Sequence, residues 1–373
     1  MRDEELRRQF TDWARPLRAA APPAVPVLRR RARWRAGRRA AASLATAAAV
    51  AGIALVSLPR TGPGVLVAAP ASPPRFAVVL QHASGSQPAR VTDMTTGKTA
   101  GLVRPPVTAS SFEWAAATPG GRTFVLADQS QTRIYRFYRL HLTAGGRPGP
   151  LRLLRVAPLH FAQIYGMALT ADGSKLALAW QNDPNAPQRS RIQVTTLATG
   201  ATRTWTSARG SADTVSWAGT RTLAFDWQDA ARPARSGIRL LNTAAPGTSP
   251  LGSRLLIPGT TRAGRLRLPA SPLITTTGVL ATLATGPGGA ATVIAEFSAR
   301  TGHLLRTLTP PATVTGSQAV WYCGILYADP AGRHLITQCG NAQGQVTNGK
   351  YTPIHLRTHL PAANIGYANS FAW

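Results

Sequence analysis

A hairpin signal that returns about every 50 residues is the feature of this sequence that most constrains its fold. In "ALTADGSKLALAW", residues 168–180, two short apolar runs flank an Asp-Gly-Ser turn, where glycine readily takes a positive φ. Related stretches stand at residues 116–128, 215–227, 273–284 and 326–338. The equivalent turn positions of the five stretches are 53, 47, 58 and 53 residues apart along the chain. They are Thr118, Ala171, Ala218, Thr276 and Asp329. The chain therefore contains a repeat.

Each copy is followed by a second hairpin, as in "RIQVTTLATGATRTW" at residues 191–205, whose turn is Thr-Gly. Two hairpins make a four-stranded antiparallel sheet, which is the blade of a β-propeller. Solenoids of helices have a similar period but require helical periodicity, which these segments lack. We therefore expect an all-β fold of four-stranded blades, six in number, with seven as the alternative count.

The end of the chain indicates how such a ring would close. "NSFAW", residues 369–373, resembles "SSFEW" at 110–114 and "DTVSW" at 213–217, the strands that lead into a unit. Residues 73–102 contain the later strands of a unit without that first strand. We expect the C-terminal strand to complete the first blade, because closure removes the two exposed sheet edges of an open array.

Residues 168–180 also resemble the "SPDG…LA" hairpin of bacterial WD-repeat-like propellers, which are related to the TolB and YVTN groups. The resemblance covers roughly residues 73–373. It implies a propeller fold and does not by itself imply an activity.

The N-terminal part of the chain has a different composition. Residues 1–39 contain 12 arginines and four acidic residues, and residues 40–58 form a 19-residue apolar run without a charge. At about 1.5 Å per residue, a helix of that length can span the hydrocarbon layer. The basic flank places residues 1–39 in the cytoplasm, so that residues 59–73 form a spacer and residues 74–373 an extracytoplasmic propeller. A cleaved signal peptide is the alternative interpretation.

Within the basic segment, an apolar stripe would form if residues 3–14 were helical. Its members recur at spacings of four, three and four residues and are Leu6, Phe10, Trp13 and Leu17. Such a face can lie on the inner surface of the membrane, or it can dock a cytosolic partner. The sequence leaves both interpretations open.

Two cysteines, Cys323 and Cys339, flank the predicted turn of the last repeat at equal distances from Ala331. They should face each other on adjacent strands within about one residue of register. In an oxidising compartment a disulfide between them is plausible, and two separate buried thiols are the alternative.

Four tryptophans occupy the strands that lead into the repeats. We expect them to pack between adjacent blades, although aromatic rings at a channel mouth can also stack on sugars or peptides. They are Trp114, Trp217, Trp321 and Trp373.

No catalytic, cofactor-binding or metal-binding motif is evident, and no Gly-x-Ser-x-Gly nucleophile elbow occurs. A propeller can still assemble a site from one residue per blade. The acidic residues that could converge on a cation are Glu113, Asp172, Asp183, Asp226, Asp229 and Asp329. Asp172 and Asp329 also have simple roles as turn residues. We therefore expect a protein without a cofactor that is not an enzyme.

The chain carries a net charge of +28. Its arginines are scattered and its predicted compartment lies outside the cytoplasm, so we expect no nucleic-acid partner. The predicted function is a membrane-anchored binding or scaffold protein, or a sensor, of the bacterial cell envelope. Its ligand would be a protein, a peptide or an envelope polyanion such as a glycan. The alternatives are a lactonase-like or lyase-like enzyme with a channel metal and a structural envelope component.

Overall fold

The computed structural model describes residues 74–80, 87–182, 189–229, 231–263, 266–274, 279–285, 292–308, 323–328, 334–339, 342–347, 350–353 and 371–372. The predicted cytoplasmic segment, anchor and spacer (1–39, 40–58 and 59–73) lie outside these residues, and so do Leu6, Phe10, Trp13 and Leu17. Across the described ranges, no helix has both the length and the apolarity needed to cross a bilayer.

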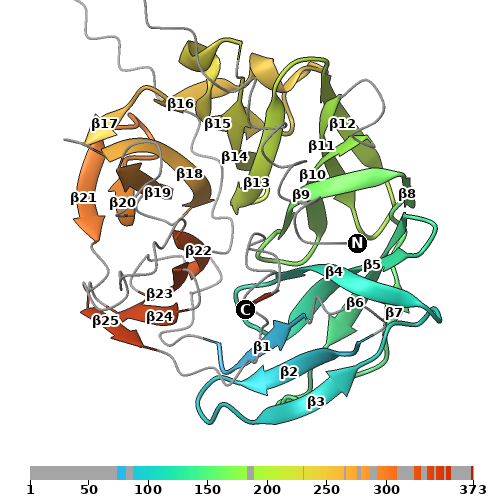
Figure 1. Ribbon diagram of the computed structural model, residues 1–373. Helices are drawn as coiled ribbons and strands as arrows, with labels where there is room; N and C mark the ends of the chain where they lie inside the picture. The colour runs from blue at the N-terminus through green and yellow to red at the C-terminus, as the bar shows by residue number, and fades with distance from the viewer. Residues whose placement is uncertain are drawn as a thin grey trace, which may run out of the picture. The chain divides into compact units, whose positions relative to one another are not determined.

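The described residues form an all-β fold of six antiparallel sheets (Figure 1). The sheet that contains both ends of the described chain is built from β26 (Phe371–Ala372), β1 (Phe76–Val79), β2 (Ala89–Asp93) and β3 (Thr99–Val103). The next has β4 (Ser110–Ala117), β5 (Thr123–Ser130), β6 (Ile134–His141), β7 (Arg152–Leu153) and β8 (Leu159–His160). The third has β9 (Ala162–Leu169), β10 (Lys175–Asn182), β11 (Ser190–Thr196) and β12 (Thr202–Ser207).

The second half of the chain supplies the other three sheets. One is built from β13 (Ser211–Ala218), β14 (Thr222–Gln228), β15 (Gly237–Asn242) and β16 (Arg254–Pro258). The next is built from β17 (Arg262–Ala263), β18 (Leu266–Ile274), β19 (Val279–Thr285), β20 (Thr292–Phe297) and β21 (Leu304–Leu308). The last is built from β22 (Cys323–Ala328), β23 (His334–Cys339), β24 (Ala342–Thr347) and β25 (Lys350–Pro353). Two short 3-10 helices, Pro233–Arg235 and Pro250–Gly252, flank β15.

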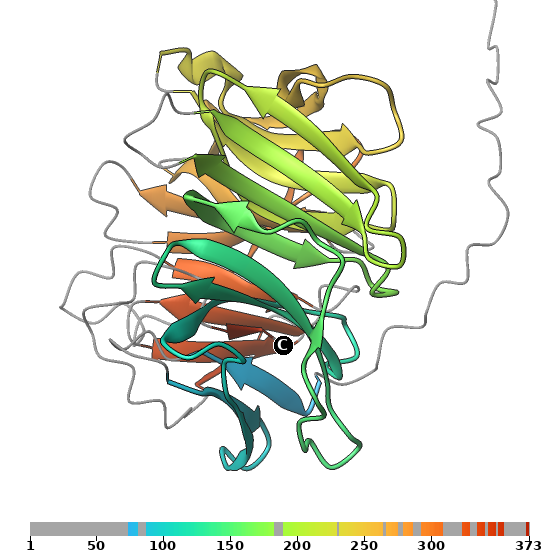
Figure 2. The same cartoon turned by 90° about the vertical axis from the view of Figure 1, so that its right-hand side faces the viewer.

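The sheets follow one another around a ring, as in a β-propeller. The inner strands contact one another in the order β26, β4, β9, β13, β18, β22 and back to β26. Viewed from the side, the strands of neighbouring sheets lie stacked with a progressive twist (Figure 2). The predicted closure is confirmed, because β26 pairs with β1 through Val78 with Ala372 and Val79 with Phe371.

The prediction of four strands in every blade is wrong for two sheets, which have five. Strand β6 is eight residues long, so its outer edge pairs with two short strands in succession. β7 pairs at Tyr138 and Arg139, and β8 pairs at Ile134 and Tyr135. In the sheet of β18, the short strand β17 pairs with the first residues of β18 and is the fifth strand.

The continuous apolar run of β10 arises because its sheet is covered on both faces. In β10, Leu176 and Leu178 pack into a core shared with the preceding sheet, which contributes Trp114. Ala177 and Ala179 of the same strand pack on the other side against Trp227 of the following sheet. All four β10 residues are essentially inaccessible to solvent.

The predicted packing role of the repeat tryptophans can be examined at two positions. Trp114 is buried in the core between the second and third sheets. Trp217 is half-buried against the core between the third and fourth sheets, and its indole Nε1 donates a hydrogen bond to the Ala168 carbonyl, at 3.1 Å. Trp321 and Trp373 lie outside the described residues.

The first strands of three sheets contain β-bulges, at Glu113, Tyr165 and Thr214, where the register with the second strand shifts. Bulges increase the local twist. They also accompany a close approach of β9 and β13, because a Cβ built on Gly166 would lie 2.9 Å from Thr214 Cα. Glycine is required there to let the two inner strands meet.

Cys323 and Cys339 are direct partners across β22 and β23, so the predicted register is confirmed. The disulfide itself remains a prediction. We expect thiol alkylation of the native protein to label neither cysteine until a reductant is added, as intact mass would show. Replacing both by serine should lower the free energy of unfolding by about 3 kcal/mol, the value for a loop of this length. Equal stability of wild type and double variant under oxidising conditions would contradict the disulfide.

Candidate functional site

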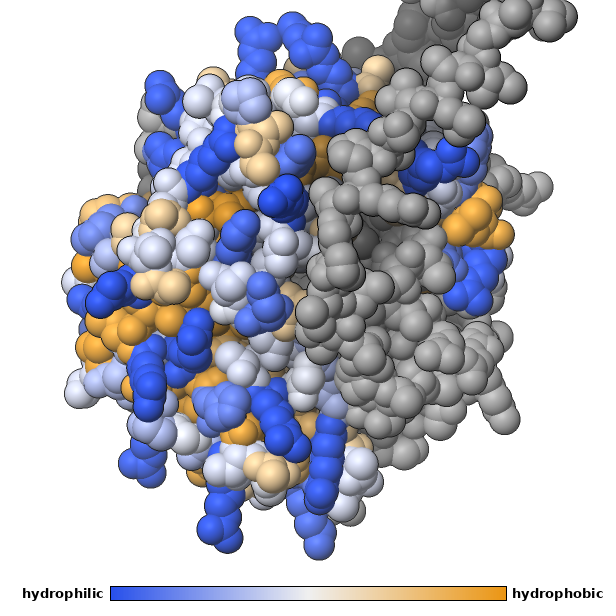
Figure 3. Space-filling model, turned by 180° about the vertical axis from the view of Figure 1, so that it is seen from behind, coloured by the Kyte–Doolittle hydropathy of each residue, from blue (hydrophilic) through white to orange (hydrophobic). Residues whose placement is uncertain are grey.

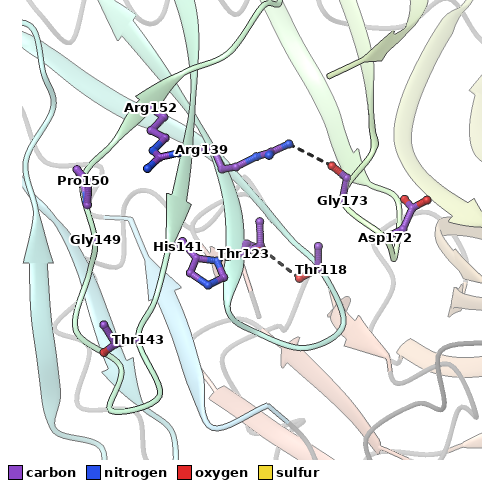
Figure 4. A pocket seen from close by; sticks show the side chains of 10 residues that line it. All are labelled: Thr118, Thr123, Arg139, His141, Thr143, Gly149, Pro150, Arg152, Asp172 and Gly173. Carbon is purple, nitrogen blue, oxygen red and sulfur yellow. Dashed lines mark hydrogen bonds between the residues drawn. The ribbon is translucent and has the colours of Figure 1, made fainter. Parts of the chain in front are cut away.

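A cleft of about 460 Å³ lies between the sheet of β4 to β8 and the β9–β10 turn of the next sheet (Figure 4). Basic and hydroxyl side chains make up most of its lining. The lining residues are Thr118, Thr123, Arg139, His141, Thr143, Gly149, Pro150, Arg152, Asp172 and Gly173.

Strand alternation places three basic side chains on one side of this sheet. Arg139 and His141 are two residues apart on β6, so both side chains point to the same face. Arg152 of β7 is the direct cross-strand partner of Arg139, and Thr123 of β5 is the partner of His141. The cleft wall therefore carries two arginines on neighbouring strands; the Arg139 guanidinium extends away from Arg152 toward Gly173, and the His141 ring lies further along β6 (Figure 4).

Arg139 connects the two sheets. Its Nη2 donates a hydrogen bond to the Gly173 carbonyl, at 3.3 Å (Figure 4). Its Nε is buried and has no hydrogen-bond partner among the described residues. Nor does either Arg139 or Arg152 form an ion pair with a carboxylate of the described residues. The cleft thus holds two arginine side chains without an ion-pair partner among the described residues.

Asp172 lies in the β9–β10 turn, on the opposite wall, and has the turn role that the sequence suggested. Its Oδ1 accepts hydrogen bonds from Thr170 Oγ1 at 2.6 Å and from the Ser174 amide at 3.0 Å. Burial acts to raise the pKa of Asp172, but these hydrogen bonds outweigh it and the pKa is lowered. The ionised carboxylate holds the turn that presents the Gly173 carbonyl to Arg139.

His141 is tied to the sheet through one ring nitrogen. Nδ1 lies 3.0 Å from the Thr123 hydroxyl, its cross-strand neighbour. When the hydroxyl donates to Nδ1, the proton of the neutral ring is on Nε2, which is left to donate to a ligand.

The other acidic residues singled out in the sequence do not converge. Glu113 occupies the β4 bulge and accepts a hydrogen bond from Ser111 Oγ, and Asp229 accepts one from the Arg232 amide within a turn. Asp183 and Asp329 lie outside the described residues. In the portion of the chain that the structure describes, no three His, Cys, Asp or Glu side chains are grouped as a metal site would require.

Asp226, by contrast, has an acidic neighbour that the sequence reasoning missed. It pairs directly with Asp213 across β14 and β13, so both carboxyl groups lie on one face of the sheet. That face also carries Ala224, which packs in a core with Phe297 of the next sheet. Oδ1 of each aspartate is buried without a hydrogen-bond partner among the described residues.

Burial raises the pKa of both members of this acidic pair. The side chain of Asp226, a residue only 2% exposed, has a pKa raised to about 7 by burial and, secondarily, by the charge of Asp213. Burial raises the pKa of the half-buried Asp213 to about 6. Only the register between β13 and β14 brings these two aspartates together, and no short sequence motif indicates it.

Comparisons with known proteins bear mainly on the fold. No family model matches the chain, and no curated protein matches it. Among solved structures it is similar to prolyl oligopeptidase B from Galerina marginata, both as the apo protein and bound to a 35mer hydrolysis and macrocyclization substrate. The identity is 10% and the TM-score 0.46 in each case, over 75% of this chain. The chain matches only 40% of the length of those structures.

These comparisons correct one prediction from the sequence. The proteins of similar structure are peptidases, so the prediction that this chain is not an enzyme is not retained. At this identity and TM-score, the likeness does not show that this chain shares the activity, the substrates or the partners of those proteins. The WD-repeat resemblance is supported only as a β-propeller-like fold.

Proposed function

We propose that this chain is a membrane-anchored protein whose β-propeller-like domain lies outside the membrane and binds a protein or peptide. The proposal places the ligand in the cleft between the sheet of β4 to β8 and the β9–β10 turn. The observation that carries it is a cavity of about 460 Å³ lined by two arginines without an acidic partner among the described residues. This volume lies within the range usual for ligand sites.

The chemistry of the lining favours a peptide-like ligand. Hydroxyl groups of Thr118 and Thr143 and the ring of His141 line the same cleft as the arginines. These groups can pair with the amides, carbonyls and carboxylates of a polypeptide. The net charge of +28 further favours an acidic partner, since opposite charge accelerates association.

The surface seen in Figure 3 does not show a comparably distinct group of side chains. On the face seen in Figure 3, hydrophilic side chains are spread over the described residues with apolar groups between them. Hydrophilic side chains spread in this way define no specific site. An envelope polyanion bound over the whole surface is therefore the alternative that the experiment must separate from cleft binding.

Anchoring is proposed from the charge-free run at residues 40–58 and its basic flank at residues 1–39. The cytoplasmic segment would then be available to a cytosolic partner, or it would lie on the membrane surface. Protease treatment of intact and of permeabilised cells distinguishes the two sides of the membrane. The propeller-like domain should be cleaved in intact cells, and a domain protected until permeabilisation would contradict the proposal.

Photo-crosslinking in intact cells tests cleft binding. A photoreactive residue replaces Thr143, an exposed residue of the cleft rim, and in a second variant Thr132. Both are exposed threonines in turns of the same sheet, but they stand at opposite ends of β6. We expect discrete protein adducts from position 143 and not from position 132. Adducts of equal yield from both positions, or from neither, would contradict cleft binding.

A further inference from the structure

Like charges occupy directly opposed positions in the cleft wall. Arg139 of β6 and Arg152 of β7 are cross-strand partners, and such pairs of like charge destabilise a sheet unless something compensates for them. The described residues provide no carboxylate within ion-pair distance of either guanidinium. Arg152 is exposed, so solvent screens this pair in part, and an anion bound in the cleft would compensate it further.

Two other arginines of this protein have guanidinium groups that donate several hydrogen bonds each. Arg239 donates to Ser253 Oγ and to the carbonyls of Arg235, Leu251 and Ser253, at 3.0–3.2 Å. Arg203 donates to three carbonyl oxygens, those of Thr243, Ala245 and Gly247. The fold thus satisfies these guanidinium groups with carbonyl oxygens of nearby turns.

Arg139 differs from both. Of its five N–H donors, only one on Nη2 has a partner among the described residues, the Gly173 carbonyl, and its Nε is buried without one. A buried donor without an acceptor is unfavourable. Arg139 therefore has donors to spare at the wall of a cavity that Arg152 also lines.

We propose that Arg139 and Arg152 form a subsite for a compact oxyanion, and that in the bound protein or peptide this group is a carboxylate. The inference rests on the proposed function and specifies the chemistry that the cleft recognises. Guanidinium groups match the two oxygens of a carboxylate or phosphate through paired N–H donors. When the Thr123 hydroxyl donates to His141 Nδ1, Nε2 is a further donor in the same cleft.

The acidic residue on the opposite wall of the cleft favours a ligand with a single carboxylate over an extended polyanion. Asp172 lines the same cleft and is ionised, so a second negative group near the β9–β10 turn would be repelled. A peptide with a terminal or side-chain carboxylate places one negative charge beside amide N–H donors. That arrangement complements cations on one wall and an acid on the other.

The test measures binding to the purified full chain in detergent. The probes are N-acetyl-trialanine with a free carboxylate, the same peptide as its amide, and inorganic phosphate. We expect the free acid to bind about tenfold more tightly than the amide, and phosphate to compete with it. Arg152→Gln, an exposed position on a two-residue strand, should reduce binding of the acid about tenfold and binding of the amide less.

Arg139→Gln is the second variant, and Arg221→Gln is the matched control. Arg221 is an exposed arginine in the β13–β14 turn, outside the cleft lining. Equal affinities for acid and amide, or an equal loss in the Arg152 and Arg221 variants, would overturn the oxyanion subsite. Crosslinks at position 143 that persist in the Arg152 variant would overturn the subsite while leaving cleft binding intact. Tight phosphate binding without any peptide binding would overturn the assignment to a carboxylate.

Discussion

A chain that lacks residues 369–373 is expected to lose on the order of 4 kcal/mol of stability, roughly 10 °C in melting temperature. The deleted segment contains β26, which pairs with Val78 and Val79 of β1 and contacts the inner strands β4 and β22. Its loss opens the ring and exposes a strand edge whose residues are almost fully buried. Thermal unfolding and the fraction of soluble protein after heating measure both consequences.

A point variant in β26 distinguishes the effect of opening the ring from the effect of removing five residues. Ala372 is 3% exposed and packs in a core with Phe112 and Val78. Ala372→Asp buries a carboxylate there and should reproduce most of the truncation effect. Ala144→Asp, in an exposed turn after β6, should change the melting temperature little. A truncated chain that melts like the intact chain would show that β26 does not hold the ring closed.

Turn chemistry and strand register were the parts of the fold most accessible from the sequence. Asp172 and Gly173 specify the β9–β10 turn by local forces alone, through carboxylate hydrogen bonds and a φ of +68° at the glycine. The pairing of Cys323 with Cys339 follows from counting outward from a turn. Closure could be predicted because the last residues repeat the lead-in pattern of the other sheets.

The cleft and the acidic pair could not be predicted in the same way. Arg139 and Arg152 are brought together by β7, a two-residue strand at the end of an irregular connection. Asp213 and Asp226 become neighbours only through a register that a bulge at Thr214 shifts by one residue. Such placements depend on tertiary pairing between strands, and no residue pattern within either strand encodes them.

Asp226→Asn is expected to stabilise the protein at pH 8 by on the order of 2–4 kcal/mol and to leave its stability near pH 4 almost unchanged. Burial raises the pKa of Asp226 from an ordinary value of 3.8 to about 7 in the folded protein. Between these two pH values the folded state binds a proton that the unfolded state has released. Stability therefore falls as the pH rises from about 4 to about 7, and an amide, which does not ionise, avoids this loss.

An aspartate with the opposite shift provides the control. Arg75 donates to Asp93 Oδ2 at 2.7 Å, and chiefly through this hydrogen bond the pKa of Asp93 is lowered to about 2. Its ionised form stabilises the fold above an ordinary pKa of 3.8, and this contribution is lost as the pH falls toward 2. Asp93→Asn should therefore destabilise the protein at pH 8 and have little effect near pH 2.

Urea unfolding at pH 2, 4, 6 and 8 measures both variants against the wild type. The stability curves of Asp226→Asn and wild type should coincide at pH 4 and separate progressively above it. The Asp93→Asn curve should approach that of the wild type near pH 2 and lie below it from pH 4 to pH 8. A destabilised Asp226→Asn protein at pH 8 would contradict the expectation. It would mean that the ionised carboxylate of Asp226 is held by a compensating positive charge, because a buried, unpaired carboxylate beside Asp213 could not otherwise favour folding.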